Sequence, residues 1–69
     1  MKYRDFLKVL TANGFVEIRQ ESRHHQFEGY VDGKRRMVTA AYSQPGEDIK
    51  PRNLASMIRQ SGLPKKLFD

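Results

Sequence analysis

The segment HHQFEGYVDGKRRMVTAAY, residues 24–42, contains two candidate strands and the turn that joins them. Both strands, HHQFEGYV and RRMVTAAY, carry aromatic and β-branched residues that fit a pleated surface. Between them, Asp32-Gly33 is a residue pair that favours the tight turn of a hairpin. The segment therefore predicts an antiparallel hairpin, on which the rest of the chain has to pack.

A further strand precedes this hairpin. Val16 and Ile18 alternate with Glu17 and Arg19, which is the period-two pattern of a strand. We expect residues 21–23 to form the first turn, although they include no glycine. Three short strands joined by short turns favour an antiparallel meander.

An amphipathic helix is predicted at the N-terminus. Four apolar residues there have the spacing i, i+3, i+4 and i+7, which places them on one face of a helix: Tyr3, Phe6, Leu7 and Leu10. Asn13-Gly14 then provides a stop, because both residues tolerate the left-handed conformation of a helix C-cap.

A second helix is predicted after the loop SQPGEDIKP. Pro51 suits the first helical position, Ile49 and Leu54 are spaced as a hydrophobic staple around the start, and Gly62 ends the helix. Its inward stripe comprises Leu54, Met57, Ile58 and Ser61. We expect three residues of the C-terminal segment to fold back onto the core: Leu63, Leu67 and Phe68.

These elements give the order α-β-β-β-α and the α+β class, in one domain that comprises residues 1–69. Each helix has a single apolar side, so we expect both helices to cover the same face of a three-stranded antiparallel sheet. The other face of the sheet is then open to water or to a ligand.

Composition excludes several classes of protein. Of the 69 residues, 38% are hydrophobic and 30% are charged, which is ordinary for a folded protein and argues against disorder. No apolar run is long enough for a membrane span, the N-terminus lacks the apolar region of a signal peptide, and there is no cysteine, so we expect a cytoplasmic protein. The net charge of +5 favours a polyanionic partner.

The two histidines, His24 and His25, are neighbours, and neighbouring side chains of a strand point to opposite faces of the sheet. Phe27 and Val31 share the face of His25. We therefore expect that face to pack against the helices, with His25 at the edge of the core and His24 on the open face.

A single exposed histidine suffices for acid–base chemistry, because its unperturbed pKa of about 6.5 lets it exchange a proton near neutral pH. RNA carries its own nucleophile, the 2′-hydroxyl, so a ribonuclease needs a base near that group and cations near the phosphate. His24 supplies the first requirement in this hypothesis. No cluster of His, Cys and carboxylates has the spacing of a metal site, so neither a metal nor a cofactor is expected.

Several segments together resemble the HicA family of toxins. They are KYRDFLKVLTANGFVEIRQ, SRHHQF, MVTAAYS and DIKPRNLASMIRQSGL, and the resemblance covers residues 2–63. The most specific part is the closing motif I-K-P-x-x-L-x-x-I/M-I-R-Q-x-G-L, and the order and spacing of the segments match as well.

The resemblance implies a fold similar to the double-stranded-RNA-binding domain and the activity of a bacterial toxin that cleaves mRNA without a metal. It implies one catalytic histidine, in a Gly-Ser-His-x-x-Phe/Tyr motif that aligns with His24, and a HicB-type antitoxin that binds the toxin and blocks this site. We expect the free toxin to be a monomer. Six residues are expected to bind RNA: Arg19, Arg23, Tyr30, Lys34, Arg35 and Arg36.

The chain departs from the family pattern beside the histidine. Ser22-Arg23 replaces Gly-Ser of the motif, which removes a glycine suited to a left-handed turn and puts a bulky cation next to His24. Arg23 either adds a phosphate contact, blocks the substrate or disfavours the charged form of His24. Ala41 stands where the family often has proline, a change that we expect to matter little.

Two other functions stay open. The chain fits a non-catalytic RNA-binding module that holds RNA by shape and phosphate contacts. It also fits an adaptor whose basic face binds an acidic protein. For any single lysine or arginine, a solvated surface charge is the simplest interpretation.

Overall fold

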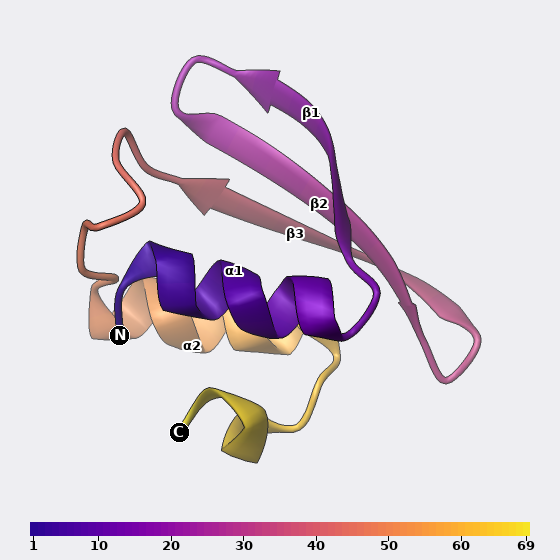
Figure 1. Ribbon diagram of the computed structural model, residues 1–69. Coiled ribbons are helices and arrows are strands. Elements are labelled where there is room, and N and C mark those ends of the chain that lie inside the picture. The colour runs from indigo at the N-terminus through magenta and orange to yellow at the C-terminus, as the bar shows by residue number, and fades with distance from the viewer.

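The computed structural model describes residues 1–69 and confirms the predicted order of elements (Figure 1). The elements are α1 Tyr3–Ala12, β1 Val16–Glu21, β2 His24–Val31, β3 Lys34–Ala41, α2 Pro51–Ser61 and the short 3-10 helix η1 Lys65–Phe68. None of the helices has the length and apolar character needed to cross a membrane.

The three strands form one antiparallel sheet in which β2 is central. β2 and β3 pair without interruption, from His24 opposite Ala41 at one end to Val31 opposite Lys34 at the other. The turn between these strands is the predicted hairpin turn, because both of its residues, Asp32-Gly33, have the positive φ angles that such a turn requires.

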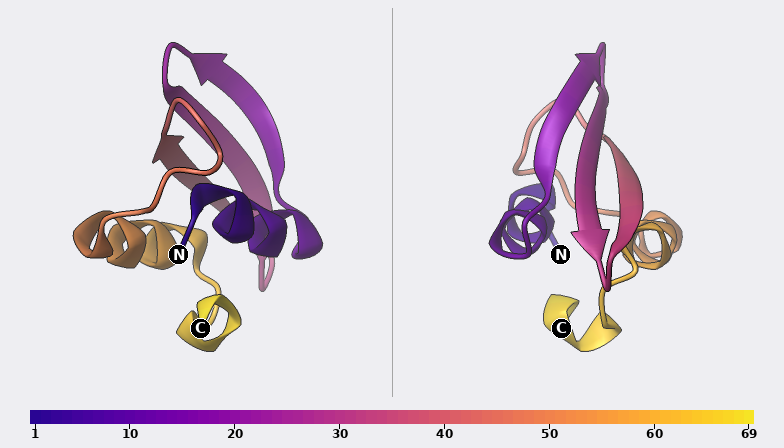
Figure 2. Two further views of the ribbon diagram at one scale, coloured as in Figure 1. Left: turned by 60° about the vertical axis from the view of Figure 1, so that its left-hand side comes forward. Right: turned by 90° about the vertical axis from the view of Figure 1, so that its right-hand side faces the viewer.

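Both helices pack on the same face of the sheet, as predicted. In the right-hand view of Figure 2, α1 lies on the side of β1 and α2 on the side of β3, and α2 contacts β3. The residues of the buried core come from both helices, from this face of the sheet and from the connecting segments: Tyr3, Phe6, Leu10, Phe15, Phe27, Val38, Ala40, Tyr42, Ile49, Met57 and Phe68. The opposite face of the sheet, which no helix covers, is called the open face below.

β1 departs from the alternation predicted from its sequence. A β-bulge between Glu17 and Arg19 breaks the register, so that Glu17 pairs with Phe27 on the helix face and Arg19 pairs with Gln26 on the open face. The expectation that Glu17 and Arg19 share one face is therefore wrong, because the bulge inserts an extra residue. The two apolar residues of this strand are 59% and 47% exposed: Val16 and Ile18.

The loop between β3 and α2, residues 42–50, is fastened to the start of α1. The carbonyl oxygens of Glu47 and Pro45 accept hydrogen bonds from the backbone N–H groups of Tyr3 and Arg4, at 3.0 and 2.8 Å. These N–H groups belong to the first turn of α1, which has no side-chain cap. The loop therefore serves as the N-terminal cap of the helix.

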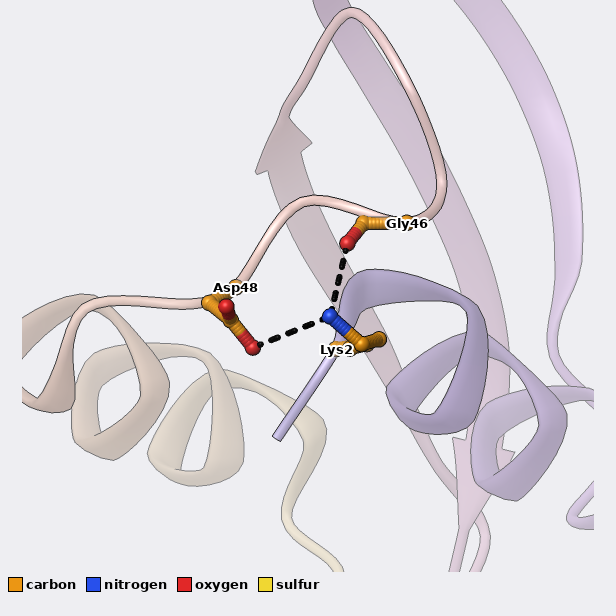
Figure 3. Close-up of polar contacts among 3 residues, drawn as sticks. All are labelled: Lys2, Gly46 and Asp48. Carbon is orange, nitrogen blue, oxygen red and sulfur yellow. Dashed lines mark hydrogen bonds and ion pairs between the residues drawn. The ribbon is translucent and has the colours of Figure 1, made fainter.

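Lys2 strengthens the same attachment (Figure 3). Its ammonium group donates to the carbonyl oxygen of Gly46 at 3.2 Å and pairs with the carboxylate of Asp48 at 3.5 Å. The backbone N–H of Ile49 donates to the carbonyl of Met1 at 2.9 Å. The chain before α1 and the loop before α2 are thus held together along their length.

The C-terminal segment folds back only in part. Gly62, with φ of 71°, ends α2 as predicted, and the buried Phe68 ring stacks on Phe6 with centroids 4.8 Å apart. Leu63 packs against the core, but Leu67 is 40% exposed. The prediction is wrong for Leu67, because in a 3-10 helix successive side chains diverge and only Phe68 turns inward.

Gly29 provides space for an aromatic ring on the helix face of β2. A Cβ atom at this position would lie 2.6 Å from atoms of the Phe15 ring, which is only 1% exposed. Gly29→Ala is therefore expected to lower the free energy of unfolding by about 2 kcal/mol through overpacking, as measured by urea denaturation. Gly46→Ala is the control, since its Cβ would come no closer than 3.8 Å to any atom. Equal midpoints for the two variants would contradict the prediction.

Candidate functional site

Two rows of mostly polar side chains lie on the open face near the β1–β2 turn. Cross-strand pairing sets each row, because residues directly opposite in a sheet share one face. The first row is Glu21, His24 and Ala41, and the second row is Arg19, Gln26 and Thr39. This end of the sheet therefore combines an imidazole with groups that carry charges and hydrogen-bonding capacity.

His24 stands on the open face, as the alternation of β2 predicts. Its side chain is exposed, and its ring nitrogens have no hydrogen-bond or ion-pair partner in the chain. The imidazole lines two hollows at once. The two hollows therefore adjoin each other at His24.

The first hollow, called the strand hollow, has a volume of about 250 Å³ and lies over the strands. Its lining is entirely polar: Arg19, Glu21, His24, Gln26 and Thr39. The guanidinium of Arg19 pairs with the carboxylate of Glu21, so the two charges offset each other.

The second hollow, called the loop hollow, has a volume of about 310 Å³ and lies between the β1–β2 turn, the 42–50 loop and the start of α2. It is lined by Tyr3, Arg23, His24, Ala41, Glu47, Asp48, Lys50 and Asn53. It brings together residues that are as far apart in the sequence as α1 and α2.

Glu47 organises the wall of the loop hollow. Its carboxylate accepts the backbone N–H groups of Gln44 and Ser43, at 2.8 and 2.9 Å, and lies 3.6 Å from the guanidinium of Arg23. The hydrogen bonds from Gln44 and Ser43 lower the pKa of Glu47, burial opposes them in part, and the charge of Arg23 adds the smallest contribution in the lowering direction. Arg23 is therefore drawn towards the loop by a carboxylate that stays ionised.

His25 occupies the position predicted for it at the edge of the core. Its side chain is 10% exposed, its Nδ1 lies 3.2 Å from the carboxylate of Glu17, and its ring stacks on Tyr42 at 4.0 Å with an interplanar angle of 7°. Burial, and then the charge of Glu17, raise the pKa of Tyr42, so the stacked phenol stays neutral. One face and the Nδ1 edge of the His25 ring are thus engaged in the fold.

The structure brings only three of the seven predicted site residues together, namely His24, Arg19 and Arg23. Tyr30 and Arg35 lie opposite each other on the open face, six residues along β2 from His24, or about 20 Å away. Arg35 pairs there with Glu28.

The remaining two cations predicted to bind RNA also lie outside the His24 end. Lys34 borders the β2–β3 turn. Arg36 pairs with Gly29 on the helix face, and its guanidinium lies against Gly62 at the C-terminal end of α2, where the helix dipole favours a positive charge. A ligand that touches both ends of the sheet must therefore be an extended one.

Sequence reasoning missed several residues around His24. The register of β3 was needed to find Thr39, and the path of the loop was needed to find Glu47, Lys50 and Asn53. Gln26 lies two residues after His24 in β2 and therefore on the same face, so the sequence alone could have identified it. No group of three or more His, Cys, Asp or Glu side chains is arranged to hold a metal ion.

Ser22 occupies a left-handed position in the β1–β2 turn, with φ of 56°. A residue with a Cβ atom is strained in this conformation by about 1 kcal/mol. Ser22→Gly is therefore expected to raise the free energy of unfolding by roughly 0.5 kcal/mol, after the greater freedom of glycine in the unfolded chain is deducted. Thermal denaturation measures the change. Ser43→Gly, at a residue without positive φ, should instead destabilise, and the same sign for both would contradict the argument.

His25→Ala is expected to lower the free energy of unfolding by about 2 kcal/mol, because it removes a buried stack on Tyr42 and the contact with Glu17. His24→Ala, at the exposed neighbour, should change stability by less than about 0.5 kcal/mol. Urea denaturation of both variants at pH 7 tests this difference. A larger loss for His24→Ala would reverse the assigned faces.

Comparison with known proteins identifies the family. The model of the family described as "HicA toxin of bacterial toxin-antitoxin" matches residues 3–63, which is most of the chain. Neither the curated proteins nor the solved structures compared with the chain gave a match. The matched region includes both hollows and His24. The chain therefore belongs to the HicA toxin family, as the toxin of a bacterial toxin–antitoxin system whose partner is an antitoxin.

Proposed function

We propose that this toxin is a metal-independent endoribonuclease that cleaves mRNA, with His24 as its acid–base group. The observation that carries the proposal is the position of His24, exposed on the open face between two polar hollows. Its neighbour His25 is held by Glu17 and Tyr42 and is not accessible to a substrate in the same way. Of the two imidazoles in the chain, only His24 meets a ligand in either hollow.

The cleavage reaction needs little beyond one imidazole and groups that hold the RNA backbone. The 2′-oxygen of a ribose forms a bond to the adjacent phosphorus while the bond from phosphorus to the 5′-oxygen of the next nucleotide breaks. One proton leaves the 2′-hydroxyl and one proton reaches the departing oxygen. His24 handles one of these transfers, and water, which has access to both hollows, handles the other. Arg23 lines the loop hollow beside His24, where its guanidinium is within reach of a phosphate held over the imidazole.

An antitoxin of the HicB type fits this site as its inhibitor. Its role follows from the exposure of His24, since a protein laid over the open face at the β1–β2 end closes both hollows at once. Covering these residues excludes RNA without any change in the toxin's fold.

A non-catalytic RNA-binding module is the second candidate function. It is favoured by the cations at the far end of the sheet, Lys34 and Arg35, which lie about 20 Å from any imidazole. RNA held there by its phosphates is bound and not cleaved.

The test uses a synthetic RNA with EDTA present and compares the wild-type protein with His24→Gln, which keeps a polar side chain and loses the titrating ring. We expect the wild type to cleave and the variant to be at least about 100-fold slower with an unchanged thermal midpoint. The same RNA with 2′-O-methyl groups throughout should resist the wild type.

Three results would contradict the proposal. They are cleavage that EDTA abolishes, cleavage that survives His24→Gln, and cleavage of the methylated RNA. Binding that falls steeply with salt and is never followed by cleavage would favour the module.

A further inference from the structure

We propose that the two hollows are subsites for the nucleotides on either side of the cut bond, the strand hollow reading a base and the loop hollow holding the sugar–phosphate backbone. This inference rests on the ribonuclease function proposed above. It adds to it the residues that set sequence preference, Gln26 and Thr39, and a residue that holds phosphate, Lys50.

The shared position of His24 is the first support. Its side chain lines both hollows, so a strand that crosses the imidazole leaves one nucleotide on each side. The volumes of about 250 and 310 Å³ are near the lower limit for sites that take small molecules, which suits a single nucleotide in each hollow.

The strand hollow has the chemistry of base recognition. Arg19 and Glu21 neutralise each other, which leaves no excess charge to attract a phosphate. Gln26 and Thr39 are directly opposite in the β2–β3 register, and neither side chain has a hydrogen-bond partner in the chain. The amide of glutamine presents a donor and an acceptor in one plane, and this arrangement matches the edge of a base.

Thr39 is also held firmly in place. Its backbone N–H, at the free edge of β3, donates to the side-chain carbonyl of Gln60 on α2 at 3.1 Å. This bond fixes the strand under the hollow and leaves the hydroxyl of Thr39 available. The recognition groups are therefore carried by paired strands and not by a loop.

The loop hollow contains one cation, Lys50, that is free to bind a phosphate, because both carboxylates of its lining are already engaged. Asp48 is paired with Lys2, and Glu47 is engaged by Arg23 and by two backbone N–H groups. Lys50 has no acidic partner in the chain and lines the same hollow. A free ammonium group binds a phosphate regardless of the base of that nucleotide. This hollow therefore binds the RNA backbone without sequence preference.

The first arm of the test measures sequence preference. The wild type, Gln26→Ala and Thr39→Val are incubated with a pool of RNAs that is randomised around one site, and the cut positions are sequenced. We expect the wild type to favour particular bases at one position beside the cut. Gln26→Ala should reduce that preference about five-fold or more at that position alone.

Thr39→Val, which replaces the hydroxyl by a methyl group of similar size, should alter the preference at the same position. Gln20→Ala, on the edge strand opposite His25, is the matched control and should leave the preference unchanged. An unchanged preference in both folded variants, Gln26→Ala and Thr39→Val, would overturn the base-reading role.

The second arm measures how the loop hollow binds the RNA backbone. Lys50→Ala should slow the cleavage of every sequence in the pool by a similar factor, several-fold at low salt, and reduce the salt dependence of RNA binding by about one phosphate contact. Lys8→Ala, an exposed lysine of α1 that lines neither hollow, is the control. A loss with Lys50→Ala that is no larger than with Lys8→Ala, or that falls on particular sequences, would overturn the backbone-holding role.

Failure of the proposed function and failure of this inference give different results. A wild-type protein that never cleaves RNA contradicts the proposed function. A wild-type protein that cleaves, together with Gln26 and Lys50 variants that behave like their controls, contradicts this inference and leaves the function intact.

Discussion

The contacts of His25 determine the direction of His24. The buried ring stacks on the Tyr42 phenol and its Nδ1 contacts the Glu17 carboxylate, and its exposure to solvent would break both contacts. Because adjacent side chains of a strand point to opposite faces, an inward His25 requires an outward His24. The unbroken pairing of β2 with β3 fixes this arrangement over the whole strand, since a slip of one residue would also expose Phe27.

The loop at residues 42–50 links the stability of α1 to the shape of the site. Its carbonyl groups cap the helix, and the carboxylate of Glu47 holds Arg23 on the other side. The backbone N–H of Tyr42 donates to the carbonyl of Arg23 at 3.0 Å, which fastens the loop to the β1–β2 turn as well. The loop hollow is therefore bounded on several sides by contacts that the fold itself requires.

Alternation and helical spacing were sufficient to predict the elements, their order and the shared face of the helices. They also placed His24 and His25 correctly, because β2 contains no irregularity. They failed at β1, which contains a bulge that its residue types do not predict. In this strand Glu17 lies on the helix face and contacts His25. They failed again for Lys50 and Asn53, since the position in space of the loop and of the start of α2 depends on long-range hydrogen bonds and not on local spacing.

The geometry of the β1–β2 turn explains how the chain accommodates Ser22-Arg23, where the resemblance to the family implies Gly-Ser. Ser22 adopts a left-handed conformation that glycine would adopt more easily, so the turn forms at some cost in strain. Arg23 would crowd or repel a charged imidazole if its side chain lay over His24. Its ion pair with Glu47 instead draws the guanidinium to the loop side and offsets its charge, while the strand hollow stays open beside the imidazole. In the proposed function, Arg23 therefore lies beside a phosphate in the loop hollow and leaves the imidazole accessible from the strand hollow.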